Sequence, residues 1–174
     1  MQLSKKEFIM YKIRIILDTK EDVIRTITVN NAINLEELHT FIATSFGFNA
    51  QEMASFYRTD DEWNQGEEIP LFNMSEFGDA LSMQTCILND SLSIHDNKLI
   101  YVYDFLHMWT FYVEVIEITE TIIENPTIVL SVGEIPETAP EKEFKAENLN
   151  EDPFDDDFND TEFDSLDDYD FSEY

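Results

Sequence analysis

Hydrophobic and polar residues alternate along the first thirty residues of the chain. Apolar side chains occupy every second position from Ile9 to Leu17, and the alternation continues from Val23 to Val29 with Arg25 as its one polar member. A period of two is typical of a strand with one face on a core, and the β-branched residues of the second segment favour the same structure. The polar run 18–22 between them is turn-like. The two segments are therefore predicted to form an antiparallel hairpin.

The pattern changes to a helical period at Asn34. Asn34 is a favoured N-cap residue, and Glu37 completes the sequence pattern of a capping box. Gly47 follows the last periodic residue, at a position where a left-handed residue commonly ends a helix. A helix is therefore predicted from Asn34 to Phe46. Its apolar stripe comprises Leu35, Leu38, Phe41, Ile42 and Phe46.

A second hairpin is predicted between residues 99 and 118. The segment from Leu99 to Phe105 is apolar on both faces, which indicates a central strand of a sheet. Leu106-His107-Met108 supplies the turn, and alternation resumes at Trp109. The apolar phase slips by one residue at Val115-Ile116, which predicts a β-bulge.

The remaining segments complete an α+β pattern. Residues 56–59 and 127–132 are predicted strands, whereas residues 60–98 give no clear period. Hairpins with one crossing helix indicate a mixed, mostly antiparallel sheet with one main helix on one face, and a β-grasp-like strand order is compatible with this succession. The predicted core comprises Ile13, Ile15, Ile27, Leu38, Phe41, Ile42, Tyr101, Tyr103, Trp109, Phe111 and Val113.

Composition divides the chain near residue 140. The 174 residues carry a formal net charge of −28. Residues 1–140 hold 23 acidic and 8 basic residues, whereas residues 141–174 hold 15 and 2. High charge with few aliphatic residues prevents a core from forming. We therefore predict an α+β domain over residues 9–136 and a disordered acidic-aromatic tail over residues 141–174.

Charge and cysteine content also limit the environment and the partners. Sequence-independent DNA affinity comes mainly from lysine and arginine, so we expect no direct binding to nucleic acid or to an anionic membrane. No segment approaches the roughly 20 apolar residues that span a bilayer, and the N-terminal residues make a poor signal peptide. The single Cys86 permits no internal disulfide. These observations favour a cytoplasmic protein.

The tail combines its carboxylates with regularly recurring aromatic residues. A purely solubilising tail needs no aromatic side chains, so a short recognition segment is the functional alternative, in which acidic residues keep the aromatics exposed until a basic, apolar groove of a partner protein captures them. The alternative without a binding role is a disordered tail that only increases solubility. The predicted partner-binding residues are Phe154, Phe158, Phe163, Tyr169 and Phe171.

Asp104 and His107 are the only weak candidates for catalysis. A carboxylate and an imidazole beside Trp109 could act as acid and base. In the structural alternative, Asp104 caps the turn by accepting backbone N–H bonds, and Phe105 and Trp109 belong to the core. His39 lies beside the helical stripe, where an orienting or surface role is expected.

Other signatures of chemistry are missing from the sequence. Asp60-Asp61-Glu62 and Glu67-Glu68 bracket Trp63 and could attract a cation, but they lack the oxygen spacing of a calcium loop, and a solvated acidic loop is the favoured interpretation. The sequence has no P-loop, no dinucleotide-binding glycine motif and no metal-spaced histidine pair. We therefore expect no metal and no cofactor.

Three blocks of sequence resemble a known family. They are MYKIRIIL with the helix LEELHTFIATSFGF, FYRTDDEW, and YVYDFLHMWTFYVEV, in which Tyr103, Asp104, Phe105 and Trp109 match the family's strand–turn–strand. Over residues 9–136 the chain resembles the Ri-plasmid open-reading-frame-three-like domain family, also labelled insertion-element passenger TnpR-like proteins. The resemblance implies a fold, because the family has no settled activity.

The resemblance does not extend to every position or to the chemistry that its label suggests. The family has Gly-Asp where this chain has Leu106-His107. Recombinases stabilise transition-state charge with clustered arginines, whereas this chain has only Arg14, Arg25 and Arg58, none adjacent to another. The sequence thus predicts a non-enzymatic interaction module that docks a basic partner. The alternatives are a DNA-mimicking inhibitor and a small enzyme centred on Asp104 and His107.

Overall fold

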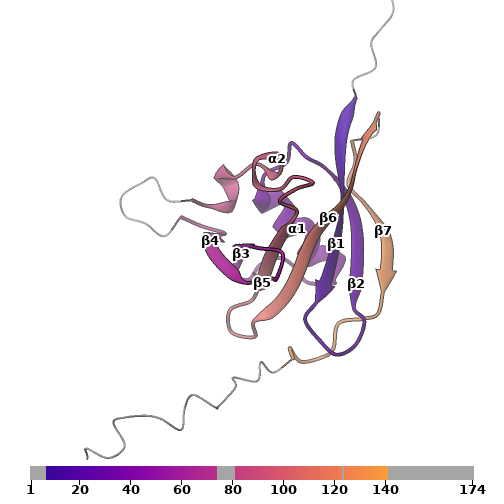
Figure 1. Ribbon diagram of the computed structural model, residues 1–174. Coiled ribbons are helices and arrows are strands. Elements are labelled where there is room, and N and C mark those ends of the chain that lie inside the picture. The colour runs from indigo at the N-terminus through magenta and orange to yellow at the C-terminus, as the bar shows by residue number, and fades with distance from the viewer. Residues whose placement is uncertain (1–6, 74–80, 123, 141–174) are drawn as a thin grey trace, which may run out of the picture. The chain divides into compact units, whose positions relative to one another are not determined.

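The computed structural model describes residues 7–73, 81–122 and 124–140 (Figure 1). These residues form a seven-stranded sheet in the order β4-β3-β5-β6-β1-β2-β7, and each pairing between described strands is antiparallel. A β-grasp-like order would include a parallel pair, so that expectation is corrected. The strands are β1 (Phe8–Leu17), β2 (Ile24–Asn30), β3 (Ala54–Thr59), β4 (Gln65–Pro70), β5 (Lys98–Tyr103), β6 (Trp109–Thr121) and β7 (Thr127–Val132).

Both predicted hairpins are present. β1 pairs with β2, and β5 pairs with β6, each in the antiparallel sense. The predicted bulge is also present, because Lys12 of β1 faces Glu117 of β6 while Ile13 faces Val115. Ile116 is therefore the extra residue on β6. The bulge coincides with the end of burial along this strand, since β6 is exposed from Ile116 to Glu120.

Helix α1 (Leu35–Ser45) covers one face of the sheet, behind β5, β6 and β1 in Figure 1. Asn34 and Glu37 form the predicted capping box, in which both hydrogen bonds measure 2.9 Å. Gly47 has the left-handed backbone (φ +93°) expected after the helix. The remaining helices are short, η1 (Met83–Thr85) and α2 (Leu88–Ser91). None of the helices in the described part of the chain is long and apolar enough to cross a membrane.

The core forms between α1 and the sheet. Ten of the eleven predicted core side chains are buried. Phe41 is the exception: it is half-buried on the side of α1 and packs against the margin of the core. Phe105, expected in the core, is exposed because β5 ends at Tyr103. Asp104 adopts a left-handed backbone (φ +60°), which turns the chain before Phe105 can continue the strand.

The unpatterned region 60–98 contains a strand that the sequence did not predict. β4 pairs with β3 and forms one edge of the sheet. Four of its six residues, Gln65 to Glu68, are exposed, and Ile69 is the one that is buried. A strand with one apolar anchor gives no alternation to detect, which explains why no element could be placed in this region from the sequence.

Arg25 joins three elements from the apolar face of β2. Its Nε donates to the carbonyl of Ser45 at 2.9 Å, in the last turn of α1. Its Nη1 donates to the carbonyls of Val132 and Gly133 at 3.0 Å each, as well as to a carbonyl of its own strand. The guanidinium carbon lies 4.9 Å from the ring centre of Phe46. Since α1 has no basic residue in its last turn, Arg25 supplies the positive charge that a helix C-terminus favours.

Candidate functional site

His39 lies in the core rather than at the surface. It is 2% exposed, and its Nδ1 is 2.6 Å from the hydroxyl of Tyr101 on β5. Burial lowers the pKa of His39 to about 4 and raises that of Tyr101, so both groups are neutral at pH 7. The tyrosine hydroxyl can then donate to the unprotonated nitrogen. This pair satisfies two buried polar groups, which gives His39 a structural role.

Asp104 and His107 meet in the exposed turn between β5 and β6. His107 Nδ1 lies 2.6 Å from Asp104 Oδ2, and Asp104 Oδ1 accepts a bond from the backbone N–H of Leu106 at 3.2 Å. The backbone N–H of Asp104 donates to Met53 at 2.8 Å. Asp104 therefore makes the turn-capping bond that the structural interpretation requires. The His107 side chain is more than half exposed, whereas that of Asp104 is only 17% exposed.

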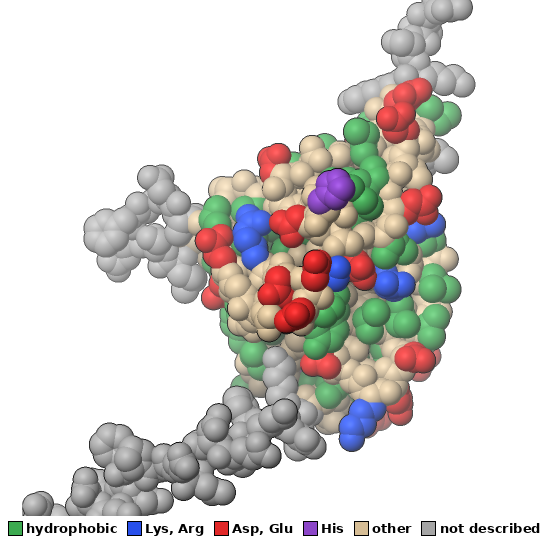
Figure 2. Space-filling model, viewed as in Figure 1, with side chains coloured by type: hydrophobic (Ala, Val, Ile, Leu, Met, Phe, Trp, Pro, Cys, Tyr) green, Lys and Arg blue, Asp and Glu red, His purple; other side chains and the backbone are tan. Residues whose placement is uncertain are grey.

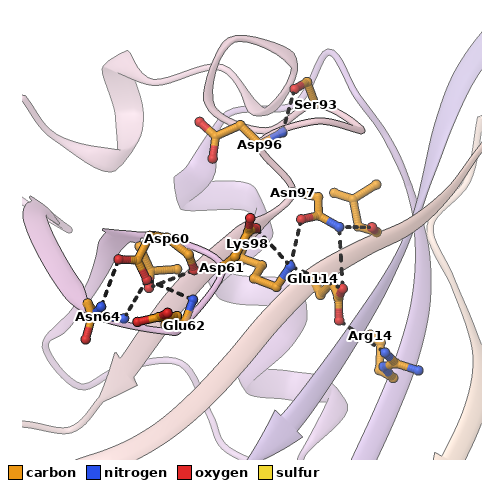
Figure 3. Close-up of polar contacts among 12 residues, drawn as sticks. Arg14, Asp60, Asp61, Glu62, Asn64, Ser93, Asp96, Asn97, Lys98 and Glu114 are labelled. Atoms are coloured by element: carbon orange, nitrogen blue, oxygen red, sulfur yellow. Dashed lines mark hydrogen bonds and ion pairs between the residues drawn. The ribbon is translucent and has the colours of Figure 1, made fainter.

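The acidic loop at 60–64 uses its first carboxylate internally (Figure 3). Asp60 accepts bonds from the backbone N–H groups of Glu62 and Asn64 at 2.9 and 3.1 Å, and from the Asn64 side chain at 2.8 Å. The hydrogen bonds from Asn64 are the main cause of a lowered pKa for Asp60. Asp60 therefore shapes the loop. Within the described residues no group of three or more acidic, histidine or cysteine side chains is placed to hold a metal ion.

A half-buried polar cluster connects this loop to the middle of the sheet (Figure 3). Lys98 of β5 lies 3.6 Å from both Asp61 and Glu114. Glu114 also pairs with Arg14 of β1 at 3.1 Å. The ammonium group of Lys98 stands 5.7 Å from the ring centre of Trp63, within cation–π range. The two positive and two negative charges of this cluster compensate one another, and Lys98 links the loop to the sheet through its contacts with Asp61 and Trp63.

A groove of about 510 Å³ opens between α1 and the connection from β6 to β7. Its apolar lining comes from Val29 at the end of β2, Ile33, Phe41 and Pro126. The half-burial of Phe41 is explained by this position, since the ring forms part of the wall. Stripe residues on a helix normally face the core, so nothing in the sequence pattern indicates that Phe41 lines a groove.

Two carboxylates stand at the groove, and its described lining contains no lysine or arginine. Glu37 accepts the capping bond from Asn34 through Oε2. Glu124 Oε1 accepts a long hydrogen bond of 3.5 Å from the side-chain amide of Asn30. An apolar lining with carboxylates suits a ligand that has an apolar body and a positive head. This groove is the candidate functional site. It was not predicted from the sequence, and its lining includes neither Asp104 nor His107.

The predicted partner-binding residues of the tail lie outside the described residues. They are Phe154, Phe158, Phe163, Tyr169 and Phe171.

The fold and the groove define a small α+β domain with an antiparallel sheet, one covering helix and an acidic surface groove. The sequence matches the family described as Plasmid pRiA4b ORF-3-like protein over residues 9–162, and the chain belongs to that family. The match extends beyond residue 136, where the resemblance was expected to end. None of the curated proteins matches the chain.

A solved structure shares this fold. It is the crystal structure of a protein of unknown function, MM3350, from Methanosarcina mazei Go1, with a TM-score of 0.61 and 17% sequence identity. The similarity covers 74% of this chain and 72% of that one. At this level of identity the likeness concerns the fold alone.

Proposed function

We propose that this protein is a non-enzymatic interaction module that binds a basic protein partner. The observation that carries the proposal is the acidic excess of the chain, 38 acidic against 10 basic residues, together with a groove whose charged lining is only acidic. Complementary charge accelerates encounter and disfavours partners of like charge. A cytoplasmic location belongs to the proposal, since the single cysteine, Cys86, is buried and unpaired.

In this proposal the tail captures the partner and the groove holds it. The tail supplies 15 carboxylates and five predicted anchors, Phe154, Phe158, Phe163, Tyr169 and Phe171. Aromatic residues contribute much of the binding energy at protein interfaces. Charge attraction is screened over about 10 Å in 0.1 M salt, so binding should weaken as salt increases.

A small enzyme centred on Asp104 and His107 has less support. The two side chains are hydrogen-bonded to each other in an exposed turn, and Asp104 also caps that turn. A catalytic acid–base pair is normally found in a concave, partly desolvated site.

Capture experiments test the proposal. The full chain should retain a partner from a lysate of its source cells, and the retained amount should fall with salt. Changing Phe154, Phe158, Phe163 and Phe171 to Ser should abolish capture, whereas changing the same four to Leu keeps the charge and the apolar character and should preserve most of it. Retention of every partner by a chain without residues 141–174 contradicts the role of the tail. Capture of nucleic-acid enzymes that DNA displaces would instead support a DNA mimic.

A further inference from the structure

β7 forms an edge of the sheet that carries neither charged residues nor proline. It stands at the end of the strand order, so no described strand lies along its outer side. All six of its residues are exposed, and its four large apolar side chains are 37–51% exposed. In Figure 2 hydrophobic side chains gather over the part of the sheet where β2 and β7 lie. The four exposed apolar residues of β7 are Ile128, Val129, Leu130 and Val132.

The opposite edge strand, β4, carries residues that protect it from pairing with other chains. β4 carries Gly66, Glu67, Glu68 and Pro70 among its six residues. Charged residues and proline on an edge strand discourage pairing with other chains. β7 has the sequence TIVLSV, without a charge, a proline or a glycine. An apolar, β-branched edge of this kind is a template for an added strand.

Carboxylates bracket this edge. Glu124 precedes β7 by three residues, and Glu134 follows its last residue by two. Glu134 is exposed. A second copy of the chain would bring another net charge of −28 to this edge. An extended segment with an apolar centre and lysine or arginine near its ends would instead place positive charge beside the carboxylates.

We propose that the outer edge of β7 binds an extended, basic segment of the partner by β-strand addition. This inference rests on the proposed function, because it takes the partner to be basic, and it adds to the groove a second contact surface on the domain. The pairing between β2 and β7 shifts register between Thr26 and Ile27, which leaves Val129 as an extra residue on β7. A bulge interrupts a regular ladder, so the added strand is short and pairs beside Leu130 to Val132 or beside Thr127 and Ile128.

The test uses the full chain and a synthetic probe, the acetylated peptide KVTVTVTK. The central VTVTVT of this peptide has six residues and is about 20 Å long when extended, so it is long enough to pair on either side of the bulge. Two further peptides are the controls: the same sequence with alternate backbone nitrogens methylated, which removes ladder donors, and EVTVTVTE, which reverses the end charges. Both should bind at least about tenfold more weakly than the probe. Hydrogen exchange should show protection of residues 127–132 on binding of the probe.

Matched protein variants separate the edge from the overall charge. Ile128→Lys with Leu130→Lys places charge on β7 and should weaken the peptide at least about tenfold. Ile94→Lys with Leu106→Lys adds the same charge at exposed apolar positions elsewhere and should change affinity less than about twofold.

Specific outcomes overturn the proposal. They are no peptide binding at concentrations on the order of 1 mM, equal loss in both pairs of variants, or binding without protection of β7. A concentration-dependent dimer that the β7 variants abolish would assign the edge to a second copy of the chain. If residues 127–132 stay unprotected while capture by the tail persists, this inference fails and the proposed function stands. If the probe protects β7 but the lysate yields no partner, the proposed function fails and strand addition at β7 stands.

Discussion

His39 Nδ1 lies 2.6 Å from the hydroxyl oxygen of Tyr101, and this contact joins helix α1 to the central strand β5 inside the core. The ring of Tyr101 in turn packs against Phe56 and Phe111, with centroids 4.9 and 5.7 Å apart. A polar pair is thus enclosed by aromatic rings. Satisfied buried pairs of this kind specify one packing arrangement, and protonation of the histidine would disturb it.

Acid should destabilise the protein through His39. Its pKa is about 4 in the folded chain, below its ordinary value of 6.5. At a pH between these two values, His39 is therefore protonated in the unfolded state but not in the folded state. The stabilisation is complete above pH 6.5 and is lost as the pH falls towards 4, by about 3 kcal/mol in total. Chemical unfolding at pH 7.5, 6, 5 and 4 measures this loss.

The carboxylates of the chain also titrate in this range, so His39→Gln is the control. Glutamine carries no titrating proton but keeps an acceptor for Tyr101. The difference in unfolding free energy between the two proteins should favour the histidine form at pH 7.5 and shrink or reverse by pH 4. A constant difference across this range would contradict the buried, neutral histidine.

Truncation of two aromatic residues should have unequal costs. Trp109 is buried on β6, so Trp109→Ala should lower the unfolding free energy by about 3–5 kcal/mol. Phe41 is half-buried in the wall of the groove, so Phe41→Ala removes less buried surface and should cost about 1–2 kcal/mol. Urea titrations of both variants provide the comparison, and equal costs would place Phe41 inside the core.

Two glycines with positive φ should respond differently to alanine. A Cβ on Gly133 (φ +73°) would stand 2.2 Å from the carbonyl oxygen of Asp22, which is backbone and cannot move aside easily. Gly133→Ala should therefore cost about 3 kcal/mol. Gly47 (φ +93°) has nothing within 4 Å of such an atom, so Gly47→Ala should cost only about 1 kcal/mol. Thermal unfolding ranks the two, and the reverse order would contradict the close approach at Gly133.

Substitution of Asp104 separates its backbone role from its charge. Asparagine tolerates a left-handed backbone and retains an acceptor for the N–H of Leu106. It loses only the exposed pairing with His107, so Asp104→Asn should cost less than about 0.5 kcal/mol. Asp104→Val places a β-branched residue at φ +60° and should cost about 1–3 kcal/mol. Similar losses in both variants would show that the carboxylate charge matters more than the conformation.

The strongly periodic parts of the fold could be predicted from the sequence. The helix at Asn34 carries its start signal, its stripe and its stop in one segment, and the bulge at Ile116 appears as a one-residue slip of phase. Both features are local. Their physical causes, capping bonds and side-chain alternation, involve only residues that are close in the sequence.

The remaining features depend on residues far apart in the sequence. β4 is held by pairing with β3, not by its own pattern. The groove arises because folding brings Phe41 and Pro126, 85 positions apart in the sequence, to the lining of the same groove. His39 is drawn into the core by a partner 62 positions away. Tertiary contacts of this kind override local preference, and a single sequence does not display them.

Arg25 makes each of its four hydrogen bonds to a main-chain carbonyl. A carbonyl is present whatever side chain the residue carries. The residue at position 45 or 132 could therefore change type among relatives while the acceptor for Arg25 stays the same. Methods that detect contacts from correlated substitutions in aligned sequences would find no correlation at this junction. In such data Arg25, which joins α1, β2 and the edge strand β7, would look like an arginine without a partner.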